Sequence, residues 1–234
     1  MKEFVVEIWG DLACFSRPET KVERFSYPVM TPSAARGVLD AIYVKPIEFS
    51  WRISKIEVLN PIQFIALRRN EVKDKISDRA IRSVSRNGGE LEPIIVDATK
   101  EMYSTDAKGR TQRQTIALKN TRYRIYAHIQ PRSGMESRYN ALVSQAERRL
   151  QSGKCFYQPY LGCREFVAYF SPIKEEGEPI SNSIDLGWML YDVFDLDSIT
   201  TGNAKPFISL FKAKLENGIL HVPSWDSPQV KKPL

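Results

Sequence analysis

The order in which extended and helical segments alternate along the chain constrains its fold more than any single motif. Residues 3–9 alternate apolar and polar side chains as a strand does, and Thr31 is placed to cap a helix that begins at Pro32. That helix must end before Pro46, because proline excludes the preceding residue from helical backbone angles. The later elements are an extended run at 49–65, a strand at 122–129, a helix at 136–152 and a strand at 164–170.

This order of strand, helix, strand, strand, helix, strand predicts an α+β fold of the ferredoxin-like (RRM-like) βαββαβ type, with one open sheet face. Modules that bind single-stranded RNA use this architecture, although the aromatic signature of the ordinary RNA-recognition motif is missing. We expect this domain to span residues 1–173, with a polar insertion around residues 67–109. Residues 174–234 are expected to form a small β extension with a hairpin at Asn217 and Gly218.

A strongly basic stretch precedes the second predicted helix. Residues 107–135 contain seven cationic side chains and no carboxylate: Lys108, Arg110, Arg113, Lys119, Arg122, Arg124 and Arg132. Alternation within residues 122–129 places Tyr123, Ile125, Ala127 and Ile129 on one face, and Arg122, Arg124, Tyr126 and His128 on the other. The second face combines charge for phosphates, a ring that stacks on bases and a group that titrates near neutral pH. The alternative is a set of solvated charges on an exposed sheet face.

Composition favours a nucleic-acid partner. The chain has 234 residues and a formal net charge of +6, while residues 165–200 hold eight carboxylates against Lys174 alone, so the positive charge belongs to the earlier part of the chain. An acidic protein partner and a merely soluble surface are the alternatives. The sequence shows no signal peptide and no membrane-spanning apolar run, so we expect a cytoplasmic protein that does not bind membranes.

The cysteines and histidines do not form a ligand pattern. Three cysteines at irregular spacing and two histidines predict no transition-metal site, and no cofactor-binding motif is present. We therefore expect no metal and no cofactor, although a Mg²⁺ site built from scattered carboxylates stays open.

Five segments carry a resemblance to a known family. They are WGDLACF at 9–15, which is followed by SYPVMTP at 26–32, AIYVKP at 41–46, GRTQRQTIALKNTRYRIYAH at 109–128, RRLQSGKCFYQPYLGCREF at 148–166 and the later IDLGW at 184–188. Together they make the chain similar to the fifth family of CRISPR-associated proteins in its type I-C form. The resemblance implies a metal-independent endoribonuclease that trims precursor CRISPR RNA and stays bound in the interference complex. The alternative is a non-catalytic subunit that holds the tag of RNA cut by another enzyme.

The resemblance also implies a reaction and its partners. A ribose 2′-hydroxyl attacks the adjacent phosphate and leaves a 2′,3′-cyclic phosphate, with protein groups assisting proton transfer and charge stabilisation. The implied partners are CRISPR repeat RNA, the other subunits of a type I-C effector complex and, through that complex, double-stranded DNA.

The family pattern has a tyrosine where Tyr43 stands and a Lys-His pair near the start of the second helix. The nearest match to that pair is Arg138 and Tyr139, which departs from the pattern. Tyr139 also lies on an apolar stripe, which favours core packing equally, and a phenol is a poor base near pH 7. His128 is a further candidate acid or base, with a phosphate or backbone contact as the alternative. The expected RNA-binding residues are Lys108, Arg110, Arg113, Lys119, Arg122, Arg124 and Arg164.

Overall fold

The computed structural model describes residues 1–20, 22–97, 102, 108–173, 177–199 and 206–233. It divides the chain into a larger unit, formed by Met1–Ile65 and Ile116–Leu234, and a smaller unit, Ala66–Thr115. The strands are β1 (Glu3–Ala13), β2 (Arg24–Phe25), β3 (Phe49–Val58), β4 (Phe64–Val72), β5 (Arg110–Pro131), β6 (Tyr169–Pro172), β7 (Ile184–Asp192), β8 (Ser209–Glu216) and β9 (Ile219–His221). The helices are α1 (Pro32–Ile42), α2 (Asp78–Asn87), the short 3-10 helix η2 (Glu136–Arg138) and α3 (Tyr139–Gln151).

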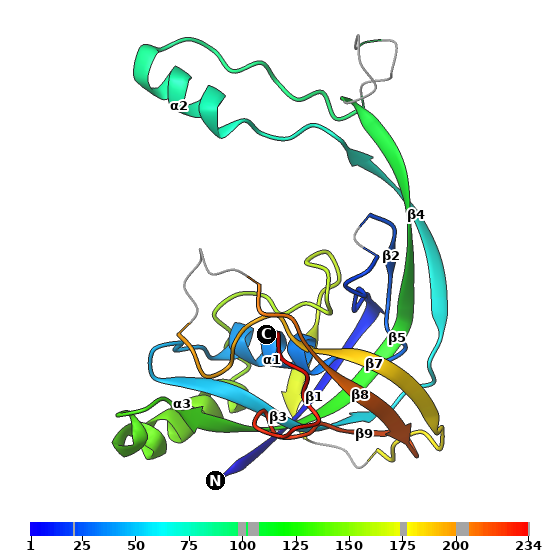
Figure 1. Ribbon diagram of the computed structural model, residues 1–234, viewed down its shortest axis with the longest axis vertical. Helices are drawn as coiled ribbons and strands as arrows, with labels where there is room; N and C mark the ends of the chain where they lie inside the picture. Colours follow the sequence, from blue (N-terminus) through cyan, green and yellow to red (C-terminus); the bar gives the residue numbers. More distant parts are fainter. Residues whose placement is uncertain (21, 98–101, 103–107, 174–176, 200–205, 234) are drawn as a thin grey trace. The chain divides into compact units, whose positions relative to one another are not determined.

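A large antiparallel sheet forms the frame of the larger unit (Figure 1). Its strands follow the order β6-β1-β5-β3-β9-β8-β7, and β2 and β4 also pair with β5. Strand β5 is the central partner, since β1 and β3 both pair with it in antiparallel register. Mixed α and β structure with few helices, expected from the order of segments, is confirmed.

Helix α1 forms where the sequence predicts it. The Thr31 hydroxyl oxygen accepts a hydrogen bond from the Ala34 backbone N–H at 3.2 Å, and Pro32 occupies the first turn. Its apolar residues, including Val38 and Leu39, are buried against the sheet, which α1 contacts at β3. Helix α3 contacts β6 and α1, and thus contributes to the same core.

The core contains interlocked aromatic rings. Phe4 of β1 meets Trp51 of β3 edge to face, with 5.2 Å between ring centroids, and Phe49 meets Trp51 in the same manner at 5.6 Å. Ile125 and Ile129 of β5 are fully buried beside them. The alternating apolar face predicted for residues 122–129 is confirmed.

The expected strands have different bounds in the structure: β1 and β5 are longer than predicted, and two others divide or begin later. The extended run predicted for residues 49–65 divides after Val58, because Pro61 has no N–H to donate to a neighbouring strand. The strand predicted at 164–170 begins only at Tyr169, because the Phe166 N–H instead donates to the Cys163 carbonyl at 2.9 Å in a turn.

The C-terminal strands continue the same sheet. Asn217 and Gly218 both have positive φ angles, 48° and 74°, and connect β8 to β9 as the sequence predicts. Strand β9 pairs with β3, which joins the C-terminal strands to the N-terminal ones.

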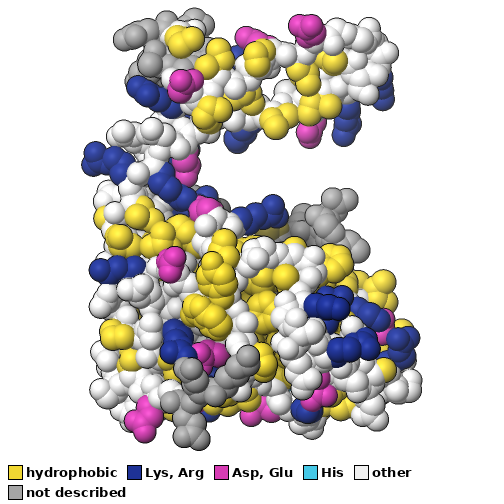
Figure 2. Space-filling view, turned by 180° about the vertical axis from the view of Figure 1, so that it is seen from behind, with side chains coloured by type: hydrophobic (Ala, Val, Ile, Leu, Met, Phe, Trp, Pro, Cys, Tyr) yellow, Lys and Arg dark blue, Asp and Glu magenta, His cyan; other side chains and the backbone are white. Residues whose placement is uncertain are grey.

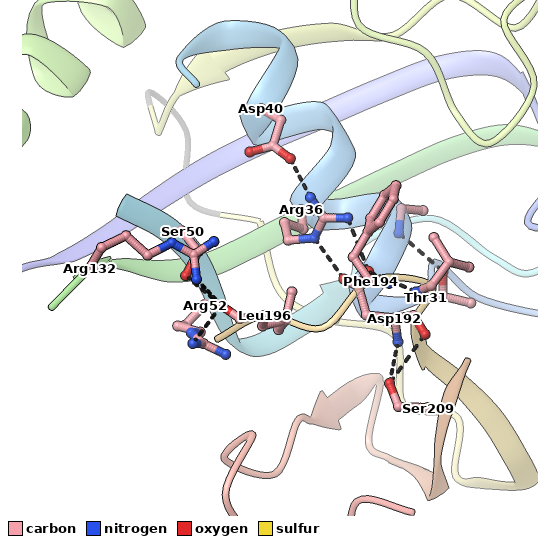
Figure 3. Close-up of polar contacts among 12 residues, drawn as sticks. Thr31, Arg36, Asp40, Ser50, Arg52, Arg132, Asp192, Phe194, Leu196 and Ser209 are labelled. Carbon is pink, nitrogen blue, oxygen red and sulfur yellow. Dashed lines mark hydrogen bonds and ion pairs between the residues drawn. The ribbon is translucent and has the colours of Figure 1, made fainter. Parts of the chain in front are cut away.

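Within the larger unit, arginine side chains join α1, β3 and the end of β5 to the end of β7 and the segment after it (Figure 3). Arg36 of α1 pairs with Asp40 and with Asp192 of β7, the latter at 2.6 Å. Arg52 and Arg132 both donate to the Leu196 carbonyl, at 3.0 Å from Arg52. These contacts hold the segment after β7 against α1 and β3.

The smaller unit contains the end of β4, helix α2 and the start of β5. Ser77 caps α2 by accepting the Ala80 N–H at 3.2 Å, and Gly88 at its other end has φ 71°. The polar composition of these residues predicts an insertion but no helix, so α2 is a finding of the structure. Within the described residues, no helix is long and apolar enough to cross a membrane.

Candidate nucleic-acid interface

Tyr43 directly follows helix α1 and caps its C-terminal end. Its N–H donates to the Leu39 carbonyl at 2.8 Å, and its carbonyl accepts the Trp51 indole N–H at 2.8 Å. Its ring lies against Phe49 at 5.2 Å, and only 5% of the residue is exposed. The sequence placed Tyr43 off the apolar face, and that expectation is wrong for its ring, which β3 covers. Within the described part of the chain, no residue hydrogen-bonds to its hydroxyl.

Charged side chains surround this tyrosine. We call the group formed by Tyr43, Lys45, Glu48, Arg138 and Arg149 the Tyr43 cluster. Lys45 pairs with Glu48 at 2.7 Å, and Arg138 approaches the same carboxylate at 3.4 Å. The Arg149 guanidinium lies 5.8 Å from the centre of the Tyr43 ring and donates to the Ile42 carbonyl at 3.1 Å. Three cations against one carboxylate give the cluster a positive charge, which suits a phosphate.

The cluster affects the ionisation of its members in opposite directions. Burial raises the pKa of Tyr43 above its ordinary value, although Lys45 and the two arginines act against this. A hydrogen bond from Lys45 lowers the pKa of Glu48. At neutral pH the phenol therefore keeps its proton and can donate a hydrogen bond, while Glu48 stays ionised between two cations.

The structure places Tyr43 and Arg138 in one cluster, and it places Tyr139 and His128 outside this cluster. Lys45, Glu48 and Arg149 were not among the expected site residues. Lys45 stands two residues after Tyr43, within the segment AIYVKP, so its proximity could have been inferred from the sequence. Arg149 comes from the far end of α3, and only the packing of α3 against α1 reveals it.

Tyr139 occupies the first position of α3 and makes a different contact. Its hydroxyl accepts a hydrogen bond from the backbone N–H of Lys2, whose side chain pairs with Glu147 of the same helix. The residue is half-buried. This contact ties the start of β1 to α3, which favours the structural alternative for Tyr139.

His128 lies on the sheet face opposite to Tyr43. Its backbone neighbours are Glu3 on β1 and Arg52 on β3, and it lines a hollow of about 670 Å³ together with Arg132 and Trp225. Partial burial and the positive charge of Arg52 lower the pKa of His128, so the imidazole is mainly neutral at pH 7. The structure does not bring His128 and Tyr43 to one phosphate.

The two arginines of the central strand form ion pairs with neighbouring strands. Arg124 is buried, 2.9 Å from Glu57 of β3 and 3.9 Å from Glu7 of β1. The Arg122 guanidinium donates a hydrogen bond to the Glu7 carboxylate at 2.7 Å, and 36% of the Arg122 side chain is exposed. The expectation that Arg124 is presented on an open face is wrong, because each flanking strand supplies a glutamate in register with it.

The remaining expected RNA-binding residues lie nearer to solvent. Lys119 and Arg164 are exposed in the larger unit. Glu165, which follows Arg164 in the sequence, pairs with Arg24 at 3.4 Å. Lys108 and Arg110 are exposed in the smaller unit, where Arg113 is half-buried and pairs with Glu71 at 3.3 Å. In Figure 2, which shows one face of the molecule, Lys and Arg side chains gather at one side of the larger unit.

Comparison with known proteins gives this arrangement a context. The family model for Cas5 CRISPR-associated proteins, in its Cas5d form, matches residues 4–223. The CRISPR pre-crRNA endoribonuclease Cas5d of Mannheimia succiniciproducens is 38% identical over 237 residues, which is 97% of each chain. The protein with the same name from Thermus thermophilus is 41% identical over 193 residues, covering 82% of this chain and 74% of its own.

Solved structures share the fold at lower sequence identity. A crystal structure of a CRISPR-associated protein superposes with a TM-score of 0.63 and 19% identity, covering 98% of this chain and 96% of its own. Protein SMU1763c from Streptococcus mutans, described as functionally uncharacterized, gives a TM-score of 0.59 at 21% identity and covers 97% of its own chain.

Proposed function

The chain belongs to the Cas5d family of CRISPR-associated proteins, and from this membership we propose that it is an endoribonuclease that cleaves precursor CRISPR RNA. The observation that carries the proposal is the 38% identity, over 97% of both chains, to a protein named as a CRISPR pre-crRNA endoribonuclease. The positively charged Tyr43 cluster supports it, because a scissile phosphate develops extra negative charge during cleavage.

The finer proposal concerns the reaction. The 2′-hydroxyl oxygen forms a bond to the adjacent phosphorus, the bond from phosphorus to the 5′-oxygen breaks, and a 2′,3′-cyclic phosphate remains. The 2′ proton passes to water, because the Tyr43 phenol keeps its own proton and is a poor base. We assign no step to a metal ion.

Four members of the Tyr43 cluster then have a role. The Tyr43 hydroxyl donates a hydrogen bond to a phosphate oxygen, and its ring is held in place by Phe49. Arg138, whose side chain is 53% exposed, binds two phosphate oxygens through its planar guanidinium. Lys45 supplies the proton for the departing 5′-oxygen. Glu48 is a positioning residue, since it pairs with both Lys45 and Arg138.

The other expected residues serve binding or structure in this proposal. Lys119 and Arg164 contact RNA phosphates, as do Lys108, Arg110 and Arg113 of the smaller unit, whereas the Arg122 guanidinium is already paired with Glu7. His128 and Tyr139 lie apart from the cluster and are assigned no proton transfer. After cleavage the protein stays with its product in a type I-C effector complex, through which it meets double-stranded DNA.

The fold has a place in the proposal as well. We interpret the order β6-β1-β5-β3, with α1 after the first strand and α3 after the third, as ferredoxin-like. Residues 1–173 form this RNA-processing part, and residues 174–234 form a β extension.

One incubation tests the reaction. The purified protein is mixed with its own genomic repeat RNA in EDTA, and we expect one discrete cut near the base of the repeat hairpin, with a 2′,3′-cyclic phosphate end. Replacing the upstream 2′-hydroxyl by hydrogen should abolish cleavage and leave binding intact. Cleavage of the deoxy substrate would exclude internal attack, while tight binding without any cleavage would favour the non-catalytic tag-binding subunit.

A further inference from the structure

A second hollow, of about 660 Å³, lies on the sheet face that carries Arg122. Its lining includes side chains from β1, β5 and the turn after β3: Glu7, Trp9, Asp11, Asn60, Asn120 and Arg122. Residues two apart on a strand share one face, so Glu7, Trp9 and Asp11 enter the hollow side by side. All of these residues belong to the larger unit, and none of them belongs to the Tyr43 cluster.

Two aromatic rings form a platform beside this hollow. Trp9 of β1 lies opposite Tyr169 of β6 on one side and opposite Arg122 of β5 on the other. The two rings are 6.1 Å apart and only 26° from parallel. Trp9 is 37% exposed and Tyr169 is 54% exposed, so neither ring is used by the core.

The approach of the chain to this platform depends on a glycine. A side chain at Gly10 would meet the Val167 carbonyl oxygen at 2.6 Å, so only glycine lets β1 lie this close to the segment that leads into β6. The neighbouring Trp9 is thereby held next to Tyr169. An aromatic pair across two strands also stabilises an edge strand, and the experiment below separates that role from ligand binding.

The charges of the lining indicate which part of a nucleotide fits. Glu7 and Asp11 carry negative charge against the single guanidinium of Arg122, which Glu7 already binds. These carboxylates would repel a run of negatively charged phosphates. They would not repel an uncharged nucleobase. The Asn60 side-chain amide donates a hydrogen bond to the Asn120 backbone carbonyl at 2.9 Å, which holds this amide at the hollow. Side-chain amides form hydrogen bonds with the edges of bases.

We propose that this hollow binds one unpaired nucleobase of the RNA, stacked on the Trp9 ring, which lines the hollow and is itself held against Tyr169. The inference rests on the proposed function, because it takes the RNA to be the substrate or product of this chain. Stacking on an exposed aromatic pair is a common way for proteins to hold single-stranded RNA. The site would hold a base outside the hairpin, since paired bases have no free face.

An abasic scan tests this inference in the full chain. Repeat RNAs that lack one base at a time are titrated against wild type, and against Trp9→Leu and Tyr169→Leu. We expect one unpaired position at which loss of the base weakens wild-type binding by about fivefold or more. At that position the two variants should lose no further affinity, because the same contact cannot be lost twice.

Matched variants control for folding and for general loss of aromatic surface. Trp9→Phe keeps a stacking ring and should keep most of the affinity, while Trp188→Leu removes a 47% exposed tryptophan of β7 and should change nothing. Thermal unfolding checks that each variant is folded, and if Trp9→Leu is not, Tyr169→Leu decides. Unchanged affinity in the folded variants, or equal losses at every abasic position, would overturn the inference and point to strand pairing or a protein ligand. Absence of RNA binding by wild type would instead contradict the proposed function.

Discussion

Tyr43 is fixed by its backbone hydrogen bonds and by Phe49, which makes its hydroxyl the group that a single-atom change can test. Tyr43→Phe keeps the ring and the packing. We expect single-turnover cleavage to fall by about 10²-fold, because a hydrogen bond made mainly in the transition state contributes to rate. The dissociation constant for repeat RNA should change by less than about threefold.

Two comparisons make the Tyr43 result specific. His128→Asn should leave the rate within about threefold, because His128 lies on the opposite sheet face from the cluster. The wild-type rate should not fall between pH 7 and 9, because burial raises the pKa of Tyr43 and the phenol keeps its proton there. Full activity of Tyr43→Phe would remove the hydroxyl from the mechanism.

Arg124 stabilises the fold more than it serves RNA, because it is buried between Glu57 and Glu7. Arg124→Met should lower the free energy of unfolding by about 2 kcal/mol, since it removes a buried charge-assisted hydrogen bond to Glu57 while Lys55 and Arg122 still pair with Glu57 and Glu7. Lys214→Met is the control, because Lys214 and Glu216 form an exposed pair and its loss should cost less than about 1 kcal/mol. Urea denaturation measures both, and equal effects would contradict a structural role for Arg124.

For single residues, the sequence predicts which face of a strand or helix a side chain occupies, but not which side chains of other elements contact it. Alternation correctly placed Arg122 and Arg124 together, while the glutamates that neutralise them come from strands more than 60 residues away along the chain. The same holds for Tyr43, whose ring is covered by β3 through a contact that helical periodicity does not contain. Pairing register, rather than propensity, decides the exposure of these side chains.

Among the elements, α1 carries a buried charge network that makes stability depend on pH. Arg36 lies between Asp40 and Asp192, and burial raises the pKa of Asp40 to about 6. Between about pH 4 and 6 the Asp40 carboxyl then binds more protons in the folded state than in the unfolded state, so its contribution to stability falls as pH rises through this window. The effect on the free energy of unfolding is about 2 kcal/mol.

Asp40→Asn tests this network. The variant should be at least as stable as wild type at pH 8 and should lose most of the change between pH 4 and 6, because its amide does not titrate. Urea denaturation at several pH values measures both effects. Asp226→Asn, which alters an exposed carboxylate, should keep the wild-type pH dependence. A wild-type stability that rises from pH 4 to 6 while the variant's stays flat would contradict the assignment to Asp40.

Local signals account for the elements that the sequence predicted well. Thr31 and Pro32 mark the start of α1, and Asn217 with Gly218 marks the β8–β9 turn, because each acts through its own backbone angles. Helix α2 has comparable signals in Ser77 and Gly88, but they lie in a polar segment without the apolar periodicity that marks a buried helix. The pairing of β9 with β3 could not have been predicted, since it joins segments that no local pattern relates.

For the molecule as a whole, the two compact units allow the contribution of the smaller unit to RNA binding to be tested separately from the folding of the larger unit. The core residues of the larger unit come from Met1–Ile65 and Ile116–Leu234, so joining Ile65 to Ile116 through an Asn-Gly turn should preserve its cooperative thermal unfolding. The excision removes three expected phosphate contacts, Lys108, Arg110 and Arg113. The salt dependence of RNA binding, as the slope of log K against log salt, should therefore flatten by about 2 to 3. Changing only these three residues to Gln in the full chain should reproduce that slope, because the neutral side chains release no counterions. A folded excision variant with the wild-type slope would show that the phosphates are held by the larger unit alone.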